Sequence, residues 1–122
     1  MCYTYFMNNN HTVTKTFEVF YAHPDGGFRY IATVSLTANG EMHMSHWLEE
    51  LFWRQQGENF SPHGEAREMI EEKGVQHTSM SVGDIARNVE TGEVWKVANI
   101  GWVDVKGAPC WAGATLSIER HE

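Results

Sequence analysis

The fold of this chain is decided by residues 76–105, which read QHTSMSVGDIARNVETGEVWKVANIGWVDV. Two runs in this stretch, residues 85–89 and 94–100, are rich in the β-branched and apolar side chains that favour strands. The ETGE sequence between them places Gly92 where a hairpin turn needs a positive φ. The sequence therefore predicts a central β-hairpin, and we expect the earlier part of the chain to cover it.

The first part of the chain predicts another hairpin. Residues 12–22 are mostly β-branched and aromatic, and residues 28–36 alternate between apolar and polar side chains. The HPDGG sequence at 23–27 favours a turn, because proline presets φ and glycine accepts a positive φ. Beyond the central hairpin, residues 101–105 continue or bend its second strand, and residues 111–118 are predicted to form a last strand.

Two helices are predicted between the hairpins. The first has Ser45 as its N-cap and Gly57 as its stop, and the second runs from residue 62 or 63 to residue 73. The buried stripe of the first helix consists of Trp47, Leu48, Leu51 and Phe52.

Together these elements predict an α+β fold, in which a mostly antiparallel sheet of about five strands carries two helices packed on one face. The 122 residues have the length of a single domain, residues 1–122, in which we expect residues 1–11 to be flexible.

The chain carries 16 Asp and Glu against nine Lys and Arg, which gives a net charge of −7. Because binding to a phosphate backbone depends on Lys and Arg, we expect no direct contact with nucleic acid. No window has the roughly 20 apolar residues that a membrane span needs, and two cysteines make no disulfide framework. The composition therefore predicts a cytoplasmic protein that does not associate with membranes.

Metal binding and cysteine catalysis are both weakly indicated. His43 and His46 stand three residues apart and would bind zinc only with a ligand from elsewhere in the chain, and histidines are ordinary at helix starts. Cys110 has no neighbouring cation to lower its pKa. We therefore predict neither a metal site nor a cofactor.

The run HTSMSVGDI at 77–85, followed by the hairpin and then by Gly101 and Trp102, carries a resemblance to a known family. It resembles the signature of the YodL-like small domains of phage, conjugative-element and actinobacterial accessory proteins, which have an SxSVxDxV phrase and then a strand pair ending in glycine plus an aromatic residue. The resemblance covers residues 77–102. It implies a mobile-element origin and no particular activity.

The residues of this signature admit two interpretations. In the first, Val82, Gly83 and Asp84 form a structural turn that enters the sheet, which is the more usual role of glycine and aspartate. In the second, a polar pocket is formed by His77, Ser79, Ser81 and Asp84.

Two surfaces on the helices are candidates for binding. Trp53 lies at the edge of the buried stripe beside Arg54, a composition found in binding hot spots, although Trp53 can also cover the rim of the core. The second helix is acidic on its outer face, which is either a solvated surface or an imitation of nucleic-acid charge. The carboxylates that we single out there are Glu68, Glu71 and Glu72.

We therefore expect a non-enzymatic phage or mobile-element accessory protein that binds and modulates a host protein or protein complex, in the cytoplasm of the host cell. An anti-defence inhibitor with an acidic surface fits this expectation. The alternative is a small-ligand-binding protein or enzyme with a polar pocket around residues 77–84. A third interpretation is a structural part of a larger assembly, which would be a homo-oligomer.

Overall fold

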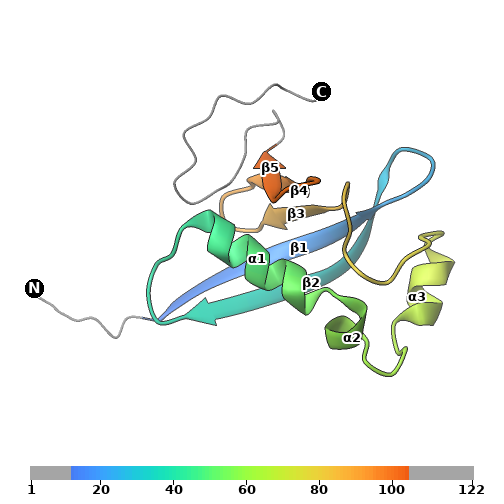
Figure 1. Ribbon diagram of the computed structural model, residues 1–122, viewed down its shortest axis with the longest axis horizontal. Coiled ribbons are helices and arrows are strands. Elements are labelled where there is room, and N and C mark those ends of the chain that lie inside the picture. Colours follow the sequence, from blue (N-terminus) through green and yellow to red (C-terminus); the bar gives the residue numbers. More distant parts are fainter. Residues whose placement is uncertain (1–11, 105–122) are drawn as a thin grey trace, which may run out of the picture.

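The computed structural model describes residues 12–104, which form one five-stranded antiparallel sheet and three short helices (Figure 1). The order of the strands across the sheet is β2-β1-β3-β4-β5, so β3 is the middle strand. This arrangement confirms the α+β fold. Of the predicted central hairpin only the first strand is in the middle, and the first hairpin extends the same sheet beside it instead of covering it. The strands are β1 (Val13–Ala22), β2 (Phe28–Ala38), β3 (Ile85–Asn88), β4 (Val94–Val97) and β5 (Trp102–Asp104), and the helices are α1 (Met44–Arg54), α2 (Gly57–Phe60) and α3 (Arg67–Glu72).

The predicted first hairpin consists of the two longest strands. Its turn closes through hydrogen bonds from the His23 N–H to the Gly27 carbonyl at 2.8 Å and from the Gly26 N–H to the His23 carbonyl at 2.9 Å. Gly26 has a φ of +94°, as the turn chemistry predicts. β2 continues to Ala38, and its pairing with β1 is interrupted by a bulge at Ile31, where the partners pass from Val19–Ala32 to Phe20–Tyr30.

The predicted central hairpin is also present, but its second strand is shorter than predicted. Gly92 has a φ of +79° and donates its N–H to the Asn88 carbonyl at 2.8 Å. β4 ends at Val97, because the chain reverses at residues 99 and 100, where the Ala98 N–H bonds to the Gly101 carbonyl at 2.9 Å. Residues 102–104 therefore form the separate strand β5, antiparallel to β4. The predicted last strand and both cysteines lie outside the described residues.

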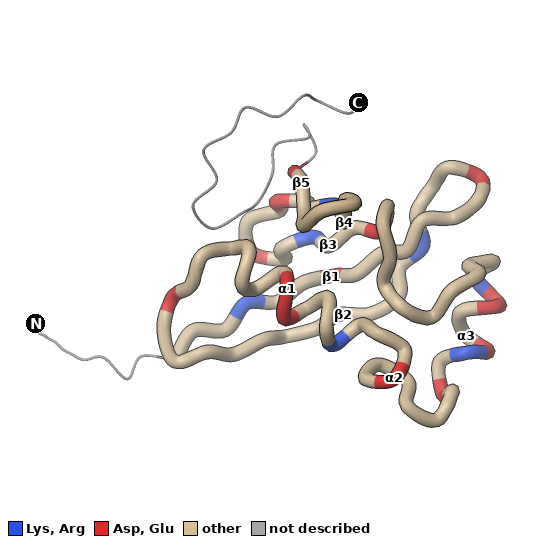
Figure 2. Tube along the Cα trace, viewed as in Figure 1, with Lys and Arg blue, Asp and Glu red and all other residues tan. Residues whose placement is uncertain are grey.

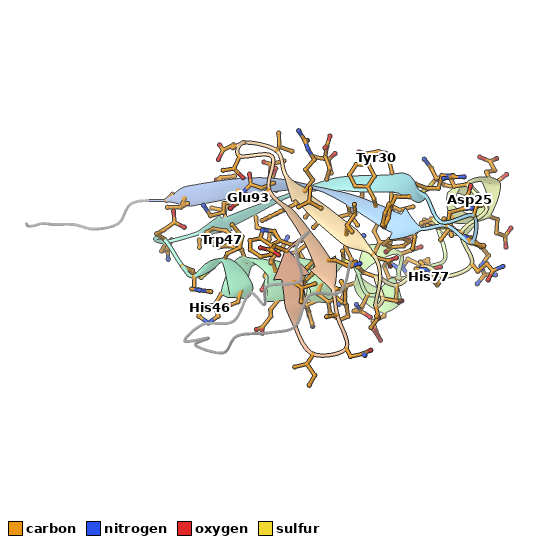
Figure 3. The ribbon with its side chains drawn as sticks, turned by 90° about the horizontal axis from the view of Figure 1, so that it is seen from above. Asp25, Tyr30, His46, Trp47, His77 and Glu93 are labelled. Atoms are coloured by element: carbon orange, nitrogen blue, oxygen red, sulfur yellow. The ribbon has the colours of Figure 1, made fainter. Side chains whose placement is uncertain are left out.

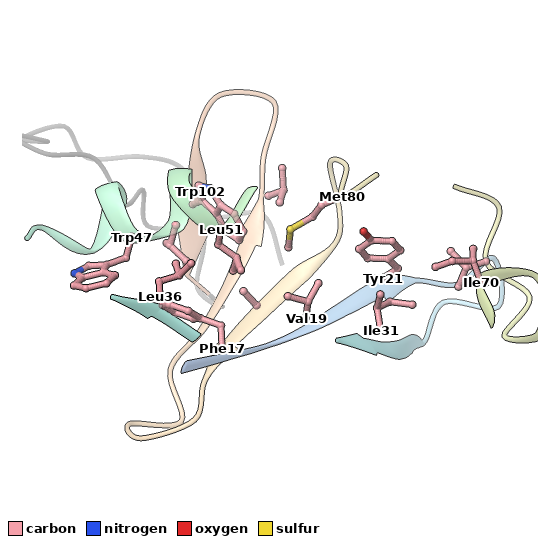
Figure 4. Packing of buried hydrophobic residues seen from close by; sticks show 14 residues of the cluster. Phe17, Val19, Tyr21, Ile31, Leu36, Trp47, Leu51, Ile70, Met80 and Trp102 are labelled. Atoms are coloured by element: carbon pink, nitrogen blue, oxygen red, sulfur yellow. The ribbon is translucent and has the colours of Figure 1, made fainter. Parts of the chain in front are cut away.

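α1 lies against one face of the sheet, while the side chain of Tyr30 points away from the opposite face (Figure 3). Trp47, Leu48 and Leu51 are buried as predicted, and Figure 4 shows Trp47 and Leu51 packed close to Leu36 and Phe17. Burial of side chains of this size contributes about 1.5–3 kcal/mol each, so the helical stripe accounts for the position of α1. Phe52 is only half-buried. Within residues 12–104 no helix has the length and apolarity to cross a bilayer.

The ends of α1 differ from prediction. The N-cap is His43 instead of Ser45, because the His43 ring nitrogen Nδ1 accepts the Ser45 N–H at 3.1 Å. The helix ends at Arg54, and Gly57 begins the additional helix α2 instead of ending α1.

α3 is shorter than the predicted second helix. It begins at Arg67, because Gly64 has a φ of +77° that interrupts a helix starting at residue 62 or 63. Its end agrees with prediction, since Gly74 has a φ of +75° and the Val75 N–H bonds back to the Ile70 carbonyl at 3.2 Å. α3 lies near the turn that joins β1 to β2 (Figure 1).

Candidate functional site

An open groove of about 590 Å³ lies between the second half of α1 and the turn that joins β4 to β5. One side is Trp53, which is 60% exposed, and another is Val82, which is 59% exposed. Trp102, only 3% exposed, forms part of the floor. We call this hollow the Trp53 groove. Its lining residues are Glu49, Phe52, Trp53, Gln56, Val82, Val97, Ala98, Asn99, Gly101 and Trp102.

The Trp53 groove is lined mainly by apolar side chains, together with one carboxylate. Among the described residues that line it, Glu49 is the one ionisable side chain. Ile100, 75% exposed, lies next to the groove at the tip of the β4–β5 turn. Large exposed apolar side chains beside a hollow are typical of surfaces that bind other molecules.

Arg54, which the sequence predicts to form a binding hot spot together with Trp53, points to a different side of α1. Its Nε donates to the Glu50 Oε2 at 3.1 Å, one helical turn away. It lines two further hollows of about 410 Å³ each that lie beside β2, and Trp53 borders one of them. Of these two residues only Trp53 lines the groove, while Trp53 and Arg54 together line one of the hollows beside β2.

The predicted acidic helix, α3, also has basic residues at both of its ends. Glu68, Glu71 and Glu72 are all exposed on α3. Arg67 begins the helix and Lys73 follows it, and Figure 2 shows blue and red segments mixed along it. The Lys73 ammonium also lies 5.6 Å from the centre of the Tyr30 ring. The three carboxylates are therefore brought together, but on a surface of mixed charge.

Asp84 of the signature is fully buried and joins distant parts of the backbone. Its Oδ1 accepts the N–H of Ala22 at the end of β1, and its Oδ2 accepts the N–H of Ser81, both at 2.8 Å. Burial raises the pKa of Asp84, against the effect of these two N–H donors and of nearby His77. The adjacent Gly83 has a φ of +99°, so the predicted turn entering the sheet is present.

The two serines of the signature are also engaged within the fold. The Ser79 hydroxyl oxygen accepts the Gly57 N–H at 2.6 Å, which satisfies a free donor in the first turn of α2. The Ser81 hydroxyl donates to the Ser79 carbonyl at 3.0 Å. These bonds tie the signature to α2 and, through Asp84, to β1.

His77 of the signature is half-buried, with a side chain that is 35% exposed. Its ring stacks on Tyr21 with 5.0 Å between centroids, and its Nδ1 lies 2.8 Å from the Ser79 carbonyl and 3.8 Å from the Asp84 Oδ2. Burial raises the pKa of the Tyr21 phenol, whose hydroxyl donates to the Thr78 carbonyl at 2.7 Å. A hydroxyl in this setting stays protonated and acts as a fixed donor.

His77 also borders a hollow of about 470 Å³. Arg67 and Glu71 of α3 line its other side. Ser79, Ser81 and Asp84 are not among its lining residues, so the hollow collects only part of the polar set that the sequence grouped.

His43 and His46 lie close together at the start of α1, with 6.5 Å between ring centroids. One nitrogen of His43 is occupied in capping the helix. Among residues 12–104, no three side chains of His, Cys, Asp or Glu are grouped closely enough to hold a metal ion.

No family model, no curated protein and no solved structure matches this chain. The resemblance to the YodL-like domains therefore rests on residues 77–102 alone.

Of the ten lining residues of the groove, only Trp53 is a site residue predicted from the sequence. Among the other nine, Val82 and Trp102 belong to the signature and to the Gly-Trp pair that follows the hairpin, and Phe52 belongs to the predicted buried stripe of the first helix. The signal in the sequence for these residues is the strand pair that ends in Gly101 and Trp102. Its position next to α1 depends on the chain reversal at residues 99 and 100. The sequence does not indicate this reversal, because Ile100 is apolar and prolongs the strand pattern.

Proposed function

We propose that this chain acts by binding another protein, with no reaction of its own, through the Trp53 groove. The observation that carries the proposal is the exposure of Trp53 beside an apolar hollow. Tryptophan is enriched among the residues that dominate binding energy, because its large ring removes much apolar surface from water when a partner covers it.

The chemistry of the groove and of the whole chain defines the kind of partner. An apolar side chain on the partner would fill the space between Trp53 and Val82, over Trp102. Basic groups around that side chain would face Glu49 and a chain whose net charge is −7. Such complementarity mainly accelerates association and excludes wrong partners.

We further propose that the partner is a host protein and that this chain is a phage or mobile-element accessory protein. The support is the resemblance of residues 77–102 to the YodL-like domains, together with the acidic charge. An anti-defence inhibitor is one form of this function. In that form the exposed carboxylates of α3, Glu68, Glu71 and Glu72, would extend the contact to a basic groove on a host enzyme.

The decisive experiment compares the unmodified chain with Trp53→Ala as baits in cells of the native host. A matched control is Phe28→Ala, because Phe28 is also an exposed aromatic residue and does not line the groove. A protein captured by the unmodified chain and by Phe28→Ala, but lost with Trp53→Ala, is then purified. Its dissociation constant should rise by roughly 30-fold or more for Trp53→Ala, the equivalent of a hot-spot residue worth at least about 2 kcal/mol.

Equal binding by the unmodified chain and Trp53→Ala contradicts the role of the groove. If no captured protein binds the purified chain directly, the proposed protein-binding function as a whole is contradicted. Replacement of Glu68, Glu71 and Glu72 by lysine tests the acidic surface separately, since unchanged affinity after this reversal excludes α3 from the interface.

A small-ligand-binding protein or enzyme is the second candidate, favoured by the hollow beside His77. Its lining combines an imidazole, the Arg67 guanidinium and the Glu71 carboxylate. A library of metabolites and nucleotides should contain a compound that raises the melting temperature, because ligand at 100 times its dissociation constant adds about 2.7 kcal/mol. The rise should disappear in His77→Ala. If no compound raises the melting temperature, the hollow is not a ligand site.

A further inference from the structure

We propose that two copies of this chain pair antiparallel through the outer edge of β2, which joins their sheets into one. Within residues 12–104, β2 is the outermost strand on its side, and it is 11 residues long. Figure 1 shows β2 along the border of the sheet opposite β5. A long edge strand presents a row of backbone donors and acceptors to any strand that approaches it.

The direction of these backbone groups follows from the register of the sheet. The Thr16 carbonyl accepts the Val89 N–H at 2.9 Å, so the backbone of Thr16 faces β3. Because backbone groups alternate along a strand, those of Phe17 face β2, and so those of its partner Val34 face β1. The N–H and C=O groups of the neighbouring residues on β2 consequently face the open edge. These residues are Thr33, Ser35 and Thr37, and all three are exposed.

The open part of β2 lacks the features that usually block an edge strand. Residues 33–38 read TVSLTA and contain no charged residue, proline or glycine. The chain as a whole carries a net charge of −7, so most other approaches of two copies bring negative charges together. Residues 33–38 themselves add no charged side chain that would oppose a second copy.

The sequence of the edge is self-complementary about Ser35. With Ser35 facing Ser35 of the second copy, Thr33 faces Thr37, and each of these pairs exchanges two backbone hydrogen bonds. Val34 then lies opposite Leu36 of the second copy. Both side chains point to the side of α1, because Val34 and Leu36 are two residues apart on β2, where they pair with Phe17 and Lys15 of β1. Every position thus meets a residue of matching polarity.

The side of β2 that faces the helices has room for the second copy. Two hollows of about 410 Å³ each lie along this strand, one lined by Val34 and Phe60 and the other by Leu36, Ala38 and Trp47. Apolar side chains of an added strand enter such hollows, which gives an edge pairing specificity beyond its backbone bonds.

The first test measures mass and its dependence on the edge. Light scattering should give twice the 13.9 kDa mass for the unmodified chain and the single mass for Ser35→Glu, which places two carboxylates opposite each other. The matched control is Thr14→Glu on β1. Each change removes one cross-strand hydroxyl contact, Ser35–Thr16 at 2.8 Å or Thr14–Thr37 at 3.1 Å, but only Ser35 lies on the edge strand. Thr14→Glu should stay dimeric.

The second test measures the register by oxidation of single cysteines in a chain whose Cys2 and Cys110 are replaced by serine. Ser35→Cys should form a disulfide-linked dimer, because paired residues of this kind have Cα atoms about 5.5 Å apart. Thr33→Cys should not, since the two Thr33 residues are offset by four residues, about 13 Å along the strand. A mixture of Thr33→Cys and Thr37→Cys should cross-link.

A chain that remains a monomer at its highest soluble concentration overturns the proposal, even where an extended segment of another protein binds the same edge. Dimers that persist in Ser35→Glu, or equal cross-linking of Ser35→Cys and Thr33→Cys, also overturn it.

Discussion

The buried carboxylate of Asp84 allows a quantitative prediction about the signature. Its two oxygens accept the N–H groups of Ala22 and Ser81, and Asp84 itself is fully buried. Asp84→Ala leaves both donors without their protein acceptor. An orphaned buried donor costs about 1–3 kcal/mol, so the loss should be roughly 2–6 kcal/mol in the free energy of unfolding.

Asp84→Asn should have a smaller effect. The amide oxygen accepts one of the two N–H groups, while the amide nitrogen faces the other. One donor is then orphaned, at about 1–3 kcal/mol, and the removal of a buried charge offsets part of that cost. Ser81→Ala is the matched control, because it removes a single hydroxyl bond to the Ser79 carbonyl and should cost about 1 kcal/mol.

Urea denaturation followed by circular dichroism measures these differences. With a slope of about 2 kcal/mol per molar urea, Asp84→Ala should lower the midpoint by roughly 1–3 M. A midpoint for Asp84→Ala that lies within the error of the unmodified chain would refute the structural role of Asp84 and would favour a site role for the signature.

Two further predictions concern the first hairpin and the core. The Gly27 N–H and the Arg29 guanidinium lower the pKa of Asp25 from 3.8 to about 2, so the folded chain binds this proton less tightly than the unfolded chain does. The free energy of unfolding of the unmodified chain, relative to that of Asp25→Asn, should therefore be constant above the unfolded pKa of Asp25 and fall as the pH drops toward 2. Denaturation at pH 2–5 measures this difference, and a difference that does not change with pH argues against the contact of Asp25 with Gly27 and Arg29. Leu51→Ala should lower the free energy of unfolding by about 2–5 kcal/mol through the cavity it leaves, and a loss below 1 kcal/mol would mean that α1 does not pack on the sheet as described.

The parts of the fold that the sequence predicted are those determined by local chemistry. The turns at Gly26 and Gly92 need a positive φ, and both hairpins form around them. The stripe of α1 has helical spacing, and Leu51 is buried accordingly. In each case a few neighbouring residues contain the whole signal, so tertiary contacts reinforce the local preference.

The parts that were not predicted depend on contacts between distant residues. α2 has four residues and no apolar period, and its first turn is capped by the Ser79 hydroxyl from 22 positions further along the chain. The reversal after β4 contains Ile100, an apolar residue that prolongs the strand pattern without entering the sheet. The Trp53 groove exists only because this reversal brings Trp102 beneath the end of α1, which no spacing within either segment encodes.

The two proposed surfaces involve strands at opposite ends of the strand order, although Trp53 borders both the groove and one hollow beside β2, and this affects how binding should be measured. The Trp53 groove is formed with the turn between β4 and β5, whereas the paired edge is β2, at the other end of the strand order. A dimer joined at β2 therefore carries one open groove at each end of a continuous sheet.

A partner fixed at high density on a surface can engage both grooves of such a dimer, so dissociation of the unmodified chain should be slower there than dissociation of Ser35→Glu. In solution, with the partner in excess, each groove binds independently and the two chains should have the same affinity. If Ser35→Glu instead weakens binding in solution to the same degree as Trp53→Ala, the partner contacts β2 itself, and the edge serves the partner and not a second copy.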